Sequence, residues 1–250
     1  EYSRNLMTVR IAKILGIDVI LDLSKKLNIY EEIPELLSVS LGAAETTLIN
    51  LTSAYAPFVN GGKKIEPNLI SRIQDRRGKT IFQVKNRKCS GCDKFIGKIN
   101  EYPKIKNTNE RVFSEETAYQ MVSILSGVVK RGTAKKLKSL KVPLGGKTGT
   151  TNDNYDAWFI GFSSNLVIGV YVGFDNPKTL GKFETGSKAA LPIFKDFAEN
   201  SLYKKDFEDF KIPENIYLTS LNYDTGIKSA PGEKNTIIEA LKPRDINNID

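Results

Sequence analysis

Lys147 is the residue best placed for chemistry, because it lies in a run of glycines and threonines, Gly146-Lys147-Thr148-Gly149-Thr150. A nucleotide-binding P-loop also ends in Gly-Lys-Thr, but it needs another glycine five positions before Gly146 to form its phosphate cradle. That position is Lys141. The run therefore does not predict a P-loop.

The sequence contains no histidine. This excludes a Ser-His-Asp triad, a Cys-His dyad and every zinc site built on histidine. Catalysis would have to use Lys, Ser, Thr, Tyr or carboxylates. We predict neither a metal nor a cofactor.

Cys89 and Cys92, the two cysteines, form a Cys-Ser-Gly-Cys pair. One pair is half of a zinc ribbon, and no second pair completes it. A thioredoxin-like motif would open a helix after a strand, whereas this pair lies in a polar loop rich in Lys and Gly. We expect a loop staple, oxidised where the compartment permits.

Thirty-seven Lys and Arg against twenty-nine Asp and Glu give a net charge of +8. Such a charge would suit a polyanion or an anionic membrane face. The basic residues of 72–106 and 130–141 lack the interleaved aromatics that stack bases, so we predict solvated surface lysines and no nucleic-acid partner. The longest apolar stretch, Trp158 to Phe174, is interrupted by Ser163-Ser164-Asn165 and predicts no membrane anchor in this chain.

Apolar residues at helical spacing predict the helices that would position these groups. Gly16 ends the first and Ser114 caps the third. The predicted helices are Asn5–Leu15, Ala44–Val59, Glu115–Lys130 and Lys188–Asn200.

Alternating and β-branched residues predict two hairpins. One pairs 68–74 with 79–84, and the other pairs 156–162 with 166–174. With 146–151 as a preceding strand, the second hairpin gives three consecutive antiparallel strands. Residues 85–109 form a polar excursion without predicted regular structure. The tail, 206–250, contains three prolines, Pro213, Pro231 and Pro243, and is expected to be loosely structured.

The surroundings of Lys147 closely resemble class A penicillin-binding proteins. The resemblance covers most of Glu1 to Asn200 and is weaker in 85–109 and toward the C-terminus. Its segments are SRN at Ser3, SLGAAETTLINLTSAY from Ser40, RGTA from Arg131, TNDNYDAWFIGF from Thr151, GVYVGFD from Gly169 and TGSKAALPIFKDF from Thr185.

Members of that family carry Ser-x-x-Lys with the nucleophile, then Ser-x-Asn, then Lys-Thr-Gly. Ser-x-Asn occurs at Ser3, Ser163 and Ser220, and chain order selects Ser3 with Asn5. The Ser-x-x-Lys at Ser201 follows Lys147, at the end of the last predicted helix. We therefore expect the nucleophile to lie upstream of this sequence and Ser201 to be incidental.

The resemblance implies D-alanyl-D-alanine transpeptidation, which cross-links peptidoglycan through a serine acyl-enzyme. It implies that Ser3 and Lys147 take part in catalysis and that Asn5 binds the backbone of the acyl donor. Thr148 and Thr150 would bind the terminal carboxylate, Gly149 would let the substrate backbone lie close, and the Thr150 N–H would supply half of the oxyanion hole. A helix N-cap is the structural alternative for Ser3.

The implied fold is α/β and β-lactamase/transpeptidase-like, an antiparallel sheet flanked by helices and incomplete at its N-terminal side. We expect one domain over residues 1–205 with an insertion at 63–113, followed by the extension 206–250. An unprotected sheet edge would make the fragment prone to self-association.

The implied partners are peptidoglycan stem peptides and β-lactam antibiotics, in a parent protein anchored at the periplasmic face of the bacterial inner membrane. This fragment alone is predicted to be inactive. Two other functions stay open: a D,D-carboxypeptidase or β-lactamase on the same fold, and a non-catalytic penicillin-binding-like sensor. The sequence does not fix the balance between transpeptidation and hydrolysis.

Overall fold

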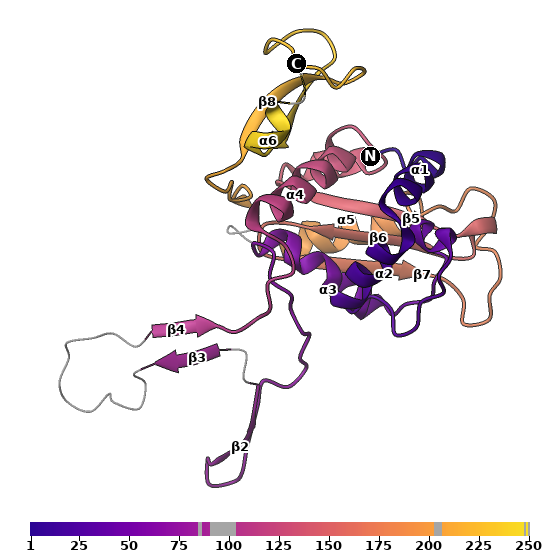
Figure 1. Cartoon of the computed structure of the whole chain (residues 1–250). Helices are drawn as coiled ribbons and strands as arrows, with labels where there is room; N and C mark the ends of the chain where they lie inside the picture. Colours follow the sequence, from indigo (N-terminus) through magenta and orange to yellow (C-terminus); the bar gives the residue numbers. More distant parts are fainter. Residues whose placement is uncertain (85–86, 91–103, 203–206, 248, 250) are drawn as a thin grey trace.

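The structure, a computed structural model, describes residues 1–84, 87–90, 104–202, 207–247 and 249. Its centre is a three-stranded antiparallel sheet in the order β5-β6-β7 with helices on both faces (Figure 1). The strands are β5 (Gly145–Thr150), β6 (Ala157–Phe162) and β7 (Val167–Val172). This is the α/β arrangement that the sequence predicts, with strand ends within two residues of the expected ones.

Opposite faces of the sheet pack against different helices. On one face, Phe159 meets Phe194 of α5 (Ala190–Ser201), with ring centroids 4.8 Å apart. On the other, a Cβ placed on Gly169 would collide with Thr52 of α3 (Leu48–Val59). Because strand side chains alternate between faces, each strand contributes to both layers.

The longest helix, α4 (Glu115–Lys130), has the predicted bounds and the predicted N-cap. Ser114 Oγ accepts a hydrogen bond from the Thr117 N–H at 3.2 Å. Val128 and Val129 join the α5 core cluster, and Val122 and Leu125 pack with Phe162. The helix thereby ties both core clusters together.

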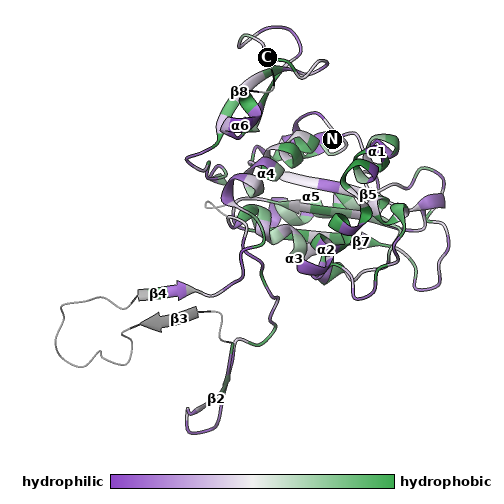
Figure 2. Cartoon of the chain, viewed as in Figure 1, coloured by the Kyte–Doolittle hydropathy of each residue, from purple (hydrophilic) through white to green (hydrophobic). Residues whose placement is uncertain are grey.

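The N-terminal segment, residues 5–26, forms two helices where the sequence predicts one, Asn5–Leu15. α1 (Asn5–Leu15) ends at Gly16, whose φ of 87° turns the chain into α2 (Ile17–Lys26). Solvent reaches apolar side chains on α1, among them Leu6 and Ile14, which are 64% and 83% exposed; these helices carry many green segments in Figure 2. α3 begins at Leu48 rather than Ala44, because the Thr47 side chain caps it by accepting from the Asn50 N–H.

Two hairpins project away from the helices and the central sheet (Figure 1). β1 (Arg72–Gln74) pairs with β2 (Thr80–Gln83) around a turn in which Asp75 Oδ1 accepts from two backbone N–H groups. β3 (Arg87–Ser90) pairs with β4 (Lys104–Asn107), where the sequence predicts no regular structure. At the base, Lys63 and Arg111 form a β-bridge. Cys92 and the Cys89 side chain lie outside the described residues, so the expected staple stays a prediction.

The expectation of a loosely structured tail is wrong. β8 (Tyr217–Asn222) pairs with β9 (Thr236–Leu241) over six residue pairs, and the short helix α6 (Pro243–Ile246) follows. Pro213, Pro231 and Pro243 all lie outside these two strands. They delimit the hairpin rather than prevent it.

Three short 3₁₀ helices complete the described elements; they are η1 (Leu37–Leu41), η3 (Lys135–Leu140) and η4 (Asn152–Asn154). Among the described residues, no helix is long and apolar enough to cross a membrane. Within the same residues β7 pairs with β6 alone, so its other edge has no strand partner there. Self-association through such an edge stays a prediction.

Candidate functional site

The site is built on β5, which pairs only with β6 in the described part of the chain. The register places Lys147 opposite Ile160 and Thr148 opposite Phe159. Because side chains alternate, Lys147 lies on the face that packs against α3, while Thr148 and Thr150 share the face that packs against α5. The shared face is what binding of one carboxylate by both hydroxyls requires.

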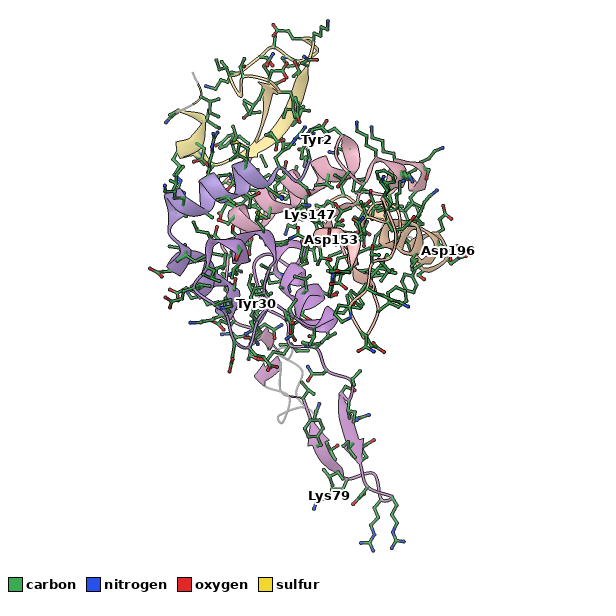
Figure 3. All side chains as sticks on the ribbon, turned by 90° about the vertical axis from the view of Figure 1, so that its right-hand side faces the viewer. Tyr2, Tyr30, Lys79, Lys147, Asp153 and Asp196 are labelled. Atoms are coloured by element: carbon green, nitrogen blue, oxygen red, sulfur yellow. The ribbon has the colours of Figure 1, made fainter. Side chains whose placement is uncertain are left out.

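Ser3 lies against Lys147, although 144 residues separate them. The Lys147 ammonium donates to Ser3 Oγ and, at 2.8 Å, to the Thr148 carbonyl. Figure 3 shows Lys147 near the middle of this side of the molecule, between Tyr2 and Asp153. The structure thus brings together the two residues that the sequence predicts to be catalytic.

Burial lowers the pKa of Lys147 below the ordinary value of a lysine. Desolvation disfavours the charged form of an amine, and no carboxylate bonded to Nζ offsets it among the described residues. A lysine with a lowered pKa exchanges a proton more readily near neutral pH. The geometry therefore suits proton transfer between Lys147 and the Ser3 hydroxyl.

Ser3 does not cap α1, so the structural alternative for it is wrong. The N-cap position is Arg4, whose side chain makes no capping hydrogen bond. Ser3 itself has φ 52°, a left-handed conformation that costs a residue other than glycine about 1–3 kcal/mol. Its hydroxyl is directed to Lys147, and the surrounding contacts have to maintain the strained backbone.

Asn5 begins α1 two residues after Ser3, with an exposed side chain. At Gly149, a Cβ would come within 3.1 Å of Trp158 Cβ, so this position is tightly packed from the β6 side. The structure tests neither the predicted role of Asn5 nor that of Gly149 in binding substrate.

Thr133 and Gly186 contact β5, although the sequence predicts no role for either. The Thr133 and Thr148 hydroxyls are 2.9 Å apart, and the Gly186 N–H donates to Thr150 Oγ1 at 3.0 Å. Both contacts lie on the face shared by Thr148 and Thr150. Thr133 and Gly186 lie in the segments RGTA and TGSKAALP, which carry the family resemblance. The spacing of these segments in the sequence does not show that they contact β5.

The other serine motifs occupy structural positions. Ser163 is buried, and its Oγ accepts from the Leu166 N–H in the turn between β6 and β7. Ser220 lies within β8. Ser201 ends α5, and Lys204 lies outside the described residues. None of the three serines lies on β5.

Comparison with known proteins decides the family. The sequence model of one protein family, the penicillin binding protein transpeptidase domain, matches residues 1–199. The chain belongs to this family of transpeptidase domains. The match covers β5 and both Ser3 and Lys147, so the family resemblance inferred from the sequence is confirmed.

Named relatives place the chain in the class A branch. Penicillin-binding protein 1A from Rickettsia conorii is 44% identical over 253 residues, which cover 100% of this chain and 31% of that protein. The crystal structure of penicillin-binding protein 1A from Haemophilus influenzae matches with a TM-score of 0.78 and 31% identity, over 95% of this chain and 38% of that one. The chain therefore corresponds to about a third of such proteins.

A more distant match shows the fold alone. The imipenem acyl-enzyme complex of penicillin-binding protein A from Mycobacterium tuberculosis has a TM-score of 0.55 at 18% identity, over 78% of this chain and 45% of that one. In that structure the protein is an acyl-enzyme with the β-lactam imipenem. The penicillin-binding transpeptidase fold therefore extends over most of the present chain.

Proposed function

We propose that this chain forms the substrate-binding and proton-transfer wall of a peptidoglycan D-alanyl-D-alanine transpeptidase, whose nucleophilic serine lies elsewhere in a longer protein. The contact between Ser3 and Lys147 carries the proposal, because it assembles two of the family's three motifs in one place. The lowered pKa of Lys147 supports it.

The reaction has two steps that the chain would assist. The upstream serine oxygen attacks the penultimate D-alanine carbonyl, an ester forms, and the peptide bond to the terminal D-alanine breaks. Ser3 and Lys147 relay the serine proton toward the leaving amine. An amine from a neighbouring stem peptide then attacks the ester, forms the cross-link and releases the serine.

β5 would bind the donor peptide along the edge that has no strand partner in the described part of the chain, as extended peptides add to sheet edges. In this account the Asn5 amide bonds to the donor backbone and Gly149 admits it. The Thr148 and Thr150 hydroxyls receive the terminal carboxylate, and the Thr150 N–H stabilises the oxyanion. Their shared face and their contacts with Thr133 and Gly186 support this arrangement.

The parent protein is proposed to be anchored in the bacterial inner membrane with this domain facing the periplasm, where stem peptides are available. β-Lactams would bind the same wall, because they resemble the D-alanyl-D-alanine ending.

Cross-linking by the full-length protein tests the proposal. Incubated with uncross-linked peptidoglycan strands, it is expected to produce dimeric stem peptides, detected by mass spectrometry. Lys147→Met should lower this rate about 100-fold or more, because proton transfer is lost. Lys195→Met, on α5 and ion-paired with Glu199, is the matched control and should keep the wild-type rate.

Two outcomes would contradict the proposal. Release of D-alanine without dimers would indicate a carboxypeptidase, in which water resolves the acyl-enzyme. If the protein binds penicillin but produces neither dimeric stem peptides nor free D-alanine, it would be a sensor.

A further inference from the structure

Arg131-Gly132-Thr133, which we call the RGT segment, joins three parts of the chain just after α4. Arg131 Nη2 lies 2.5 Å from Glu1 Oε1 and 2.6 Å from Glu239 Oε1. A Cβ on Gly132 would lie 2.6 Å from the Glu1 carbonyl oxygen. Thr133 contacts Thr148. Three consecutive residues thus touch the segment that carries Ser3, the hairpin β8–β9 and the strand that carries Lys147.

Glycines allow Glu1 to approach α4 this closely. A Cβ on Gly127 would lie 1.9 Å from Glu1 Oε1, and no real Cβ contact is that short. Together with Gly132, this position makes a surface without side chains at the end of α4, onto which Glu1 packs. Glu1 is therefore held by shape as well as by charge.

The ion pairs are largely shielded from water. The side chains of Arg131, Glu1 and Glu239 are 22%, 12% and 18% exposed. Charged pairs with so little solvent interact more strongly and are screened less than surface pairs. Ser123 also donates to Glu239 Oε2 at 3.2 Å, which fixes the second carboxylate oxygen.

A separate contact holds the hairpin at the far end of α4. Lys242 Nζ donates to Thr117 Oγ1 at 2.7 Å, in the first turn of the helix. This contact has no part in the Arg131 cluster. A variant of Lys242 can therefore weaken the packing of the hairpin on α4 without disturbing the contact between Arg131 and Glu1.

We propose that Glu239 on β9 positions Ser3 through the RGT segment, so that the C-terminal hairpin holds the Ser3 hydroxyl at Lys147. Ser3 follows Glu1 by two residues and has a strained left-handed backbone. Glu1 anchors it on one side and α1 on the other. Glu239 and Arg131 are positioning residues, because they act through Glu1 and do not touch the reacting atoms. The inference rests on the proposed function.

The test is Glu239→Gln in the full-length protein, which keeps the shape of the side chain and removes its charge. Acylation by a fluorescent penicillin is followed over a range of concentrations to separate the limiting rate from the apparent Kd. The limiting rate is expected to fall about tenfold with the apparent Kd unchanged, because a displaced hydroxyl impairs chemistry rather than binding. Lys242→Met should stay within about twofold of the wild type in rate, because Arg131 keeps both carboxylates.

Thermal unfolding of each variant completes the comparison. A Glu239→Gln rate equal to the wild-type rate, or an equal fall in Lys242→Met, would overturn the inference. If Glu239→Gln does not fold, Ser123→Ala decides: a fall of about threefold supports positioning and no change contradicts it. A wild-type protein that penicillin does not acylate would instead overturn the proposed function.

Discussion

Lys147 is partly buried at a cost to the fold, and the proposed function depends on that burial. Its ammonium group is removed from much of the solvent and bonded to a serine hydroxyl and a carbonyl oxygen, with no carboxylate bonded to it among the described residues. Burial therefore lowers its pKa. A neutral amine is easier to obtain there than in water, and the folded state holds the charged form less well than the unfolded chain does.

The free energy of unfolding of the purified chain should depend on pH because Lys147 is partly buried. Between the lowered pKa of Lys147 and the ordinary lysine value of about 10.4, the unfolded state binds more protons, so stability rises with pH. Relative to Lys147→Met, the wild type should gain stability as the pH rises toward the ordinary lysine value, because burial disfavours the charged amine only in the folded state. Urea unfolding of both proteins measures the difference, and a difference that does not change with pH would show that burial has no such effect.

At the scale of elements, β5 separates two tasks by the alternation of its faces. Lys147 meets Ser3 on the α3 face, and the Thr148 and Thr150 hydroxyls contact Thr133 and Gly186 on the α5 face. The register with β6 fixes this separation, since a shift of one residue would exchange the faces. Thr133 contacts Thr148 and Gly186 contacts Thr150, and these contacts hold the two threonine side chains of β5 in position.

Gly186→Ala tests whether close packing fixes that position. A Cβ there would lie 2.4 Å from the Gly149 carbonyl oxygen and 2.5 Å from that of Trp158. The variant should lose about 1–3 kcal/mol of stability, since both contacts are with backbone atoms that cannot move aside cheaply. Thermal unfolding measures the loss. Ser187→Ala, its neighbour, should unfold like the wild type, and equal midpoints for both variants would contradict the account.

The central elements could be predicted because their signals are local. Ser114 marks the start of α4, and the Ser163-Ser164-Asn165 turn marks the hairpin of β6 and β7. α2 was missed because Gly16 signals the end of a helix equally well when another helix follows. The hairpin β8–β9 was missed because the three prolines of the tail indicated loose structure, although all three lie outside its strands.

Chain order favoured Ser3 over Ser163 and Ser220, and the structure places Ser3 against Lys147. The roles of these residues stay predictions, and their other contacts could be predicted only in part. The partner of Thr148 and the anchor of Glu1 depend on long-range packing, and no spacing in the sequence encodes that Arg131 meets Glu239 across 108 residues.

At the scale of the whole molecule, we propose that the chain is one wall of a larger site. It corresponds to 31% of the length of its Rickettsia conorii relative, and its best-placed serine contacts a lysine rather than acting as the head of a Ser-x-x-Lys motif. The hairpin β8–β9 crosses α4 and reaches the segment that carries Ser3. The wall is therefore held together from both ends of the chain.

Covalent labelling with a fluorescent penicillin tests the central claim most directly. The account predicts that the full-length protein labels stoichiometrically and that peptide mapping places the adduct on a serine upstream of Glu1, while the isolated 250-residue chain does not label. A stoichiometric adduct on any serine within this chain would contradict it.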